Sequence, residues 1–136
     1  MDLILVLGAL PETAERKTLY ESIIGVCEPL AKEISTPINT MEFNKTANDS
    51  QRYDRAMGLV KRASLIIGEH SQPSTGLGIE IKAAENSEVP VLIVAKEGCK
   101  VSGMAKGCSV VREIIYYSSI DDLNKKISGF VNNLAE

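Results

Sequence analysis

Several features are scarce in this sequence of 136 residues, and each absence excludes a class of protein. The formal net charge is −3 and no basic stripe stands out, which argues against DNA or RNA as a partner. The longest apolar runs, near residues 3–7 and 89–95, are too short to span a bilayer, so no membrane association is expected. The first residues lack the basic region of a secretory signal, and we expect a cytoplasmic protein.

Cysteine is also scarce. The three cysteines, Cys27, Cys99 and Cys108, are odd in number and show no CxxC spacing. A disulfide framework or a zinc site is therefore not expected, and reduced thiols fit a cytoplasmic protein. We predict that the chain holds no metal.

The composition that remains is that of an ordinary globular protein. Hydrophobic residues make up 44% and charged residues 24%, and the length suits one compact domain over residues 1–136. No repeat, low-complexity tract or linker interrupts the chain.

Short apolar runs alternate with segments of helical periodicity. The runs predict five strands, at residues 2–7, 37–43, 64–68, 89–95 and 109–117. Helices are predicted over residues 12–34, 51–63, the segment after residue 74, and the end of the chain. Pro29 lies inside the first of these and predicts a kink or an early end. The glycine-rich segment 96–108 is expected to be a loop with one short helical turn.

This alternation predicts an α/β fold of the flavodoxin-like, doubly wound kind, with a five-stranded parallel sheet and helices on both faces. Ligands of such folds bind beyond the carboxyl ends of the strands. Three loops follow strands at that edge, and they cover residues 8–13, 69–78 and 96–107.

The loop that leads into residues 70–84, HSQPSTGLGIEIKAA, carries the most chemistry. Gly76 and Gly78 allow the backbone to approach a ligand closely, and the helix start suits a phosphate or carboxylate. Glu80 is expected in the first turn of that helix. Stabilisation of the helix dipole is one explanation of this glutamate, and a catalytic carboxylate is the other.

Two common nucleotide motifs are excluded at this loop. The Gly-x-Gly lacks the third glycine of the dinucleotide fingerprint, and no Gly-Lys-Ser/Thr follows as in a P-loop. His70 is the single histidine of the chain. It is either an exposed loop residue or a donor to a phosphate or a leaving group.

The stretch SQPSTGLGIEIKAA resembles the Pro-Ser-x-Gly-x-Gly-x-Glu segment of the nucleoside 2-deoxyribosyltransferase family. Among its branches, the chain is most similar to the 2′-deoxynucleoside 5′-monophosphate N-glycosidases. LGALPETAERKTLYESI resembles the family's first strand, loop and helix, and VSGMAKG resembles a loop with Ser-x-Met. The resemblance covers most of the chain.

The resemblance implies cleavage or transfer at the N-glycosidic bond of a 2′-deoxynucleoside or its 5′-monophosphate. Glu80 would attack the anomeric carbon, and Ser74 and Ser102 would hold the phosphate, the latter from a neighbouring subunit of a homodimer. No cofactor is implied. The expected catalytic residues are Glu80 and Asp54, and the expected substrate-binding residues are Gly8, Ser74, Gly76, Gly78, Ser102, Met104 and His70.

The sequence departs from the family pattern in three places. Ala56 stands where the family carries a helper aspartate, and Asp54 would face about 200° away on a regular helix. The first loop has Ala9-Leu10-Pro11 in place of a phosphate-binding Ser-x-Arg, and Leu5 replaces an aromatic hydroxyl in the first strand.

These departures leave two outcomes. The protein is either an enzyme for a different glycoside, with Asp54, Glu69, His70 or Tyr20 in helper roles, or a catalytically degenerate nucleotide-binding protein. A third hypothesis is a small-ligand sensor of the same fold.

Overall fold

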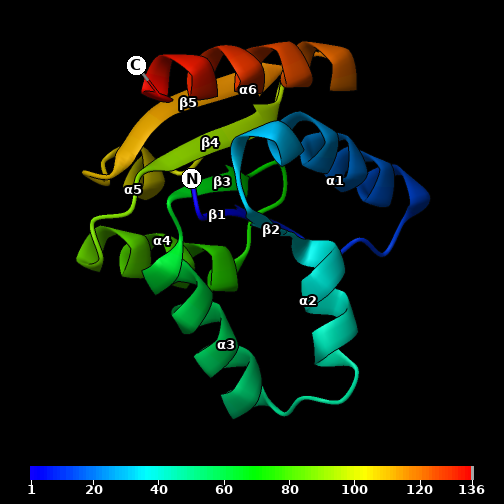
Figure 1. The fold of residues 1–136 in the computed structure, drawn as a ribbon, viewed down its shortest axis with the longest axis vertical. Helices are drawn as coiled ribbons and strands as arrows, with labels where there is room; N and C mark the ends of the chain where they lie inside the picture. The colour runs from blue at the N-terminus through cyan, green and yellow to red at the C-terminus, as the bar shows by residue number, and fades with distance from the viewer. Residues whose placement is uncertain (136) are drawn as a thin grey trace.

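The computed structural model describes residues 1–135 of the chain, which fold as a parallel sheet between two layers of helices (Figure 1). The strands are β1 (Leu3–Leu7), β2 (Glu33–Ser35), β3 (Leu65–Glu69), β4 (Val91–Lys96) and β5 (Val111–Tyr117). The helices are α1 (Ala14–Cys27), η1 (Glu28–Leu30, a 3₁₀ turn), α2 (Pro37–Asn44), α3 (Asp49–Arg62), α4 (Thr75–Asn86), α5 (Gly103–Lys106) and α6 (Ile120–Ala135).

All strand pairs are parallel, in the order β2-β1-β3-β4-β5. The predicted fold class, an α/β doubly wound sheet of five parallel strands, is confirmed. The strands β1 and β3 are buried along their whole length because helices cover both faces. Among residues 1–135, no helix is both long and apolar enough to cross a lipid bilayer.

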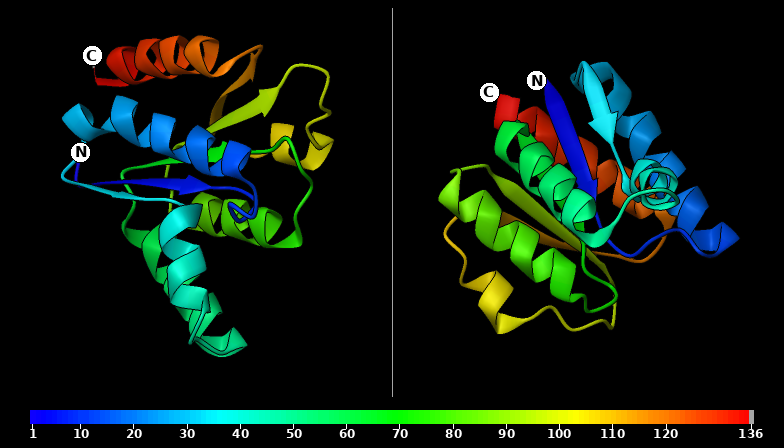
Figure 2. Two further views of the ribbon diagram at one scale, coloured as in Figure 1. Left: turned by 90° about the vertical axis from the view of Figure 1, so that its right-hand side faces the viewer. Right: turned by 90° about the horizontal axis from the view of Figure 1, so that it is seen from below.

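The core has one half on each face of the sheet. On one face α1 and α6 pack through buried side chains that include Tyr20, Ile23, Leu123 and Ile127. On the other face lie α3, α4 and the segment around α5, with Val60 among the buried side chains. Helix α3 packs beside α4, and the left view of Figure 2 shows α2 and α3 both extending away from the sheet.

The predicted strand at 37–43 is wrong, because these residues form helix α2. Thr36 and Asn39 make a capping box, and Pro37 occupies the first helical turn, where its missing N–H costs nothing. The strand of this region is β2, three residues at the sheet edge, of which the first two lie inside the helix predicted over 12–34. That helix ends early at Cys27, and Pro29 lies in the 3₁₀ turn that follows, as the sequence predicted.

Candidate active site

The carboxyl ends of β1, β3 and β4 meet at one edge of the sheet, where α4 begins. Residues 70–74 form the loop between β3 and α4. The hydroxyl of Ser74 caps the helix by accepting a hydrogen bond from the Leu77 N–H at 3.3 Å. The helix start therefore faces the edge at which ligands of this fold bind.

A cavity of about 280 Å³ opens between α4 and the α2–α3 pair. Leu5 and Leu7 of β1 form its apolar floor, and Gly76, Ile79 and Glu80 form the α4 wall. The lining from α2 and α3 consists of Thr40, Asn44, Arg52, Tyr53, Arg55, Ala56, Met57 and Leu59. We call this the Glu80 cavity.

The carboxyl group of Glu80 is largely withdrawn from water, and burial raises its pKa to about 7. Within residues 1–135 it makes no hydrogen bond. Helix α4 begins at Thr75 and has no acidic residue in its first turn, so Glu80 lies beyond the reach of the helix dipole. Its position therefore argues against capping as its main role. A poorly solvated carboxylate that ionises near neutral pH is suited to attack a substrate.

Gly76 keeps open the space between two polar groups. A Cβ atom added to it would lie 3.8 Å from Ser74 Oγ and 3.9 Å from Glu80 Oε1. The serine hydroxyl and the carboxylate therefore both lie close to Gly76 at the start of α4. These are ordinary van der Waals distances, so a small side chain would fit here, although it would take up space between the two polar groups.

A second cavity, of about 400 Å³, lies on the α5 side of α4. We call it the α5 cavity. Its lining is His70, Gln72, Pro73, Ser74, Leu77, Gly78, Ile81, Lys100, Ser102, Met104 and Ala105. Most of the expected substrate-binding residues thus line the α5 cavity, whereas Gly76 and Glu80 line the Glu80 cavity.

His70 is half-buried in the α5 cavity. Its Nε2 atom is buried and has no hydrogen-bond partner in residues 1–135. Burial lowers the pKa of the imidazole, while the neighbouring Glu69 raises it to a lesser extent. The lowered pKa favours the neutral form of the ring. His70 is not among the residues that line the Glu80 cavity.

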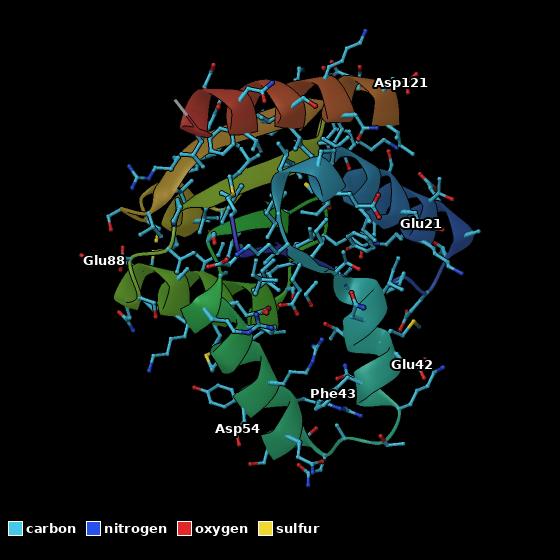
Figure 3. The ribbon with its side chains drawn as sticks, viewed as in Figure 1. Glu21, Glu42, Phe43, Asp54, Glu88 and Asp121 are labelled. Carbon is cyan, nitrogen blue, oxygen red and sulfur yellow. The ribbon has the colours of Figure 1, made fainter. Side chains whose placement is uncertain are left out.

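Asp54 and Ala56 lie on different sides of α3, as their two-residue spacing on a helix predicts. Ala56 lines the Glu80 cavity, while Asp54 is exposed and lines neither cavity. Figure 3 shows the Asp54 side chain at the periphery of the molecule, on the outer part of α3. The structure does not bring this carboxylate to Glu80.

Gly8 lies against a buried polar network and lines neither cavity. A Cβ atom on it would come within 2.5 Å of the Tyr20 hydroxyl and 3.2 Å of Glu69 Cβ, so no larger residue fits without a shift. Glu69 is 0% exposed, and its carboxylate accepts hydrogen bonds from Arg16, Ser71 and Tyr117 at 2.6–3.3 Å. These bonds leave the carboxylate engaged within the protein.

Of the cavity residues that α2 and α3 contribute, Ala56 was indicated by the sequence, whereas the two arginines and the α2 residues were not. Arg52 and Arg55 are three residues apart and share one face of α3, so their spacing was visible in the sequence. Thr40 was not predicted to line a cavity because residues 37–43 were expected to form a strand, and Asn44 was expected to lie in the polar loop after it.

The site defines a class: an α/β protein with a half-buried carboxylate aimed into a cavity at the carboxyl edge of a parallel sheet. No protein-family model matches the chain. It is 29% identical over 120 residues to a protein of Methanosarcina mazei that carries the provisional name 2′-deoxynucleoside 5′-phosphate N-hydrolase 1. That match covers 85% of this chain and 74% of the relative.

A relative of the same name from Methanosarcina barkeri is 34% identical over 80 residues, which is 57% of this chain and 50% of the relative. In structure, the chain is similar to the CMP N-glycosidase of Clostridium botulinum, with a TM-score of 0.73, 20% identity, and coverage of 93% of this chain and 98% of the other. The chain is also similar in structure to the 2-deoxyribosyltransferase of Bacillus psychrosaccharolyticus, with a TM-score of 0.67, 13% identity and coverage of 95% of each chain. The resemblance predicted from the sequence is confirmed.

Proposed function

We propose that the protein is an enzyme that cleaves the N-glycosidic bond of a 2′-deoxynucleoside or its 5′-monophosphate. The observation that carries this is the carboxyl group of Glu80, withdrawn from water and aimed into a cavity at the ligand-binding edge. The provisional name of the two relatives, 2′-deoxynucleoside 5′-phosphate N-hydrolase 1, refers to cleavage of the same N-glycosidic bond.

In the proposed reaction, an ionised Glu80 oxygen attacks C1′ of the sugar and the bond from C1′ to the base nitrogen breaks. The base leaves with the electron pair of that bond. The resulting glycosyl ester is then released by water, or by a second base if the reaction is a transfer.

We assign the phosphate of the substrate to the start of α4. Ser74 lines the α5 cavity at this point and lies close to Gly76, and helix N-termini favour anions. Lys100 and Ser102 line the same cavity and extend this polar region. We assign the sugar to the Glu80 cavity, where it can reach the carboxylate.

We further propose a homodimer that works in the cytoplasm. Met104 is 88% exposed beside Ser102, and a large apolar side chain in that position suits an interface that would close the α5 cavity. The three cysteines are unpaired within residues 1–135, which suits a reducing compartment.

The direct test is incubation of the protein with a panel of 2′-deoxynucleosides and their 5′-monophosphates, followed by chromatography for free base. Base is expected with the wild type and absent with Glu80→Ala. The second candidate, binding without turnover, is favoured because no carboxylate of residues 1–135 other than Glu80 lines the Glu80 cavity. It would be supported if deoxynucleotides raised the melting temperature while no base was released.

A further inference from the structure

Four ionisable residues line the Glu80 cavity. They are Glu80, Arg52, Arg55 and Tyr53, and no histidine, lysine, cysteine or second carboxylate of residues 1–135 lines it. A departing base is ordinarily protonated by a nearby acid with a pKa near 7. Tyrosine and arginine are much weaker acids, so apart from the nucleophile no such acid of residues 1–135 lines the cavity, and the negative charge of the leaving base must be stabilised in another way.

Arg55 is held on the wall of this cavity by two contacts with α2. Its Nη1 donates a hydrogen bond to Thr40 Oγ1 at 3.0 Å, and its guanidinium carbon lies 4.9 Å from the centre of the Phe43 ring. Both contacts orient the guanidinium but neither neutralises it. A guanidinium carries five N–H donors, so most of them remain for a ligand.

Arg55 also differs from the other arginines of its helix. Arg52 lies 3.6 Å from Asp49 and donates to the Asn44 carbonyl, and Arg62 forms a 2.7 Å ion pair with Glu33. Among residues 1–135, no carboxylate lies within 4.0 Å of Arg55. A partly desolvated cation without an acidic partner, on the wall of a cavity, is a ready site for negative charge.

Arg55 and Glu80 line the same cavity from different helices. No ion pair within 4.0 Å joins the two side chains among residues 1–135. In a displacement at C1′, the nucleophile and the leaving group occupy opposite faces of the sugar. A sugar attacked by Glu80 thus directs its base away from α4, toward the α2–α3 wall that holds Arg55.

We propose that Arg55 binds the departing base and stabilises its negative charge, and that the substrates carry bases that leave as anions, the uracil- and thymine-like keto pyrimidines. This inference rests on the proposed function. As the C1′–N bond breaks, its electron pair stays on the base, whose anion pairs with the guanidinium. Arg55 keeps its proton throughout, and solvent water protonates the base after release.

The experiment compares leaving groups in single-turnover base release. The substrates are dUMP, its 5-fluoro derivative, whose base is the more acidic and leaves more readily, and dCMP, whose base is a poor anion. Wild type is expected to cleave 5-fluoro-dUMP fastest and dCMP slowest. Arg55→Met is expected to lose about 100-fold on dUMP, the usual cost of removing one charge-stabilising donor, and clearly less on 5-fluoro-dUMP.

Arg55→Lys keeps the charge and is expected to recover part of the rate; it also serves as the test variant if Arg55→Met does not fold. The matched control is Arg62→Met, the same change on the same helix away from both cavities, which should leave all three rates within about twofold.

Different outcomes test the role of Arg55 and the proposed N-glycosidase activity. An equal loss on all substrates in Arg55→Met, or wild-type cleavage of dCMP faster than dUMP, overturns the role of Arg55 while the enzyme activity stands. No base from any substrate with the wild type overturns both.

Discussion

At the scale of single residues, Glu80 carries a cost that the fold does not offset. Its carboxyl group is half-buried and takes part in no ion pair within residues 1–135, and burial raises its pKa to about 7. In the unfolded chain the same group ionises near its ordinary value of 4.5. A group whose ionised form is disfavoured by folding is typical of a site that exists for a ligand rather than for stability.

This cost predicts a pH-dependent effect of Glu80→Gln on stability. Between pH 4.5 and 7 the folded state keeps a proton that the unfolded state has lost, so the stability of the wild type falls as the pH rises through this window. The neutral glutamine removes the penalty. The variant should therefore be more stable than the wild type above pH 7, by up to about 3 kcal/mol, and no more stable below pH 4.5.

Urea unfolding at pH 4, 6 and 8 measures this difference. A gain that is the same at all three pH values would show that Glu80 is not the titrating group. A loss of stability at pH 8 would show that the ionised carboxylate has a partner that supports it.

At the scale of elements, a buried ion pair joins α1 to the end of β3 beside the site. Arg16 donates to Glu69 Oε1 at 3.3 Å and to the Tyr20 hydroxyl at the same distance. Tyr117, at the end of β5, donates to Glu69 Oε2 at 2.7 Å. Three elements thus converge on one carboxylate that is closed to water, and they position the loop that leads into α4.

Removing Arg16 should be costly because it leaves the buried charge of Glu69 uncompensated. Arg16→Met is expected to lower the free energy of unfolding by about 3 kcal/mol, and Glu69→Gln in the same chain should restore part of it. The control is Lys126→Met, which breaks the exposed pair with Asp122 and should cost less than about 1 kcal/mol. Chemical denaturation of the four proteins measures these values, and equal costs for the two single variants would contradict this role of Glu69.

The elements also show where prediction from sequence succeeds and where it stops. β1 is an unbroken apolar run, and so is β4 up to its last residue. An apolar run of that length between turn formers is typical of a buried strand. β2 has three residues at an edge, too few to leave a pattern. The apolar residues of 37–43 therefore led to a strand prediction in the wrong segment. Thr36, Pro37 and Asn39 carry the signature of a helix start there.

The same limit applies to the site. The Pro-Ser-x-Gly-x-Gly-x-Glu motif is local, so it identified Glu80 and Gly76 as site candidates without any knowledge of the fold. The α2–α3 wall depends on tertiary packing, so Arg55 was not foreseen. Nor could the sequence show that α4 separates two cavities, which places Ser102 and Met104 on the side away from Glu80.

At the scale of the whole molecule, the α5 cavity is open on the side of an exposed methionine. If a second copy of the chain closes it, light scattering should give twice the chain mass of 14.7 kDa. Met104→Asp puts a charge into that contact and should shift the mass toward the monomer, with base release reduced about tenfold or more. A monomeric wild type with full activity would contradict the shared site.

The central claim is that Glu80 forms a bond to the sugar. Acid-quenched mass spectrometry of protein mixed with a deoxynucleoside monophosphate tests it most directly. The account predicts a transient adduct of one deoxyribose phosphate on the peptide that contains Glu80, and none in Glu80→Gln. Base release at equal rates by the wild type and Glu80→Gln, or an adduct on another residue, would contradict it.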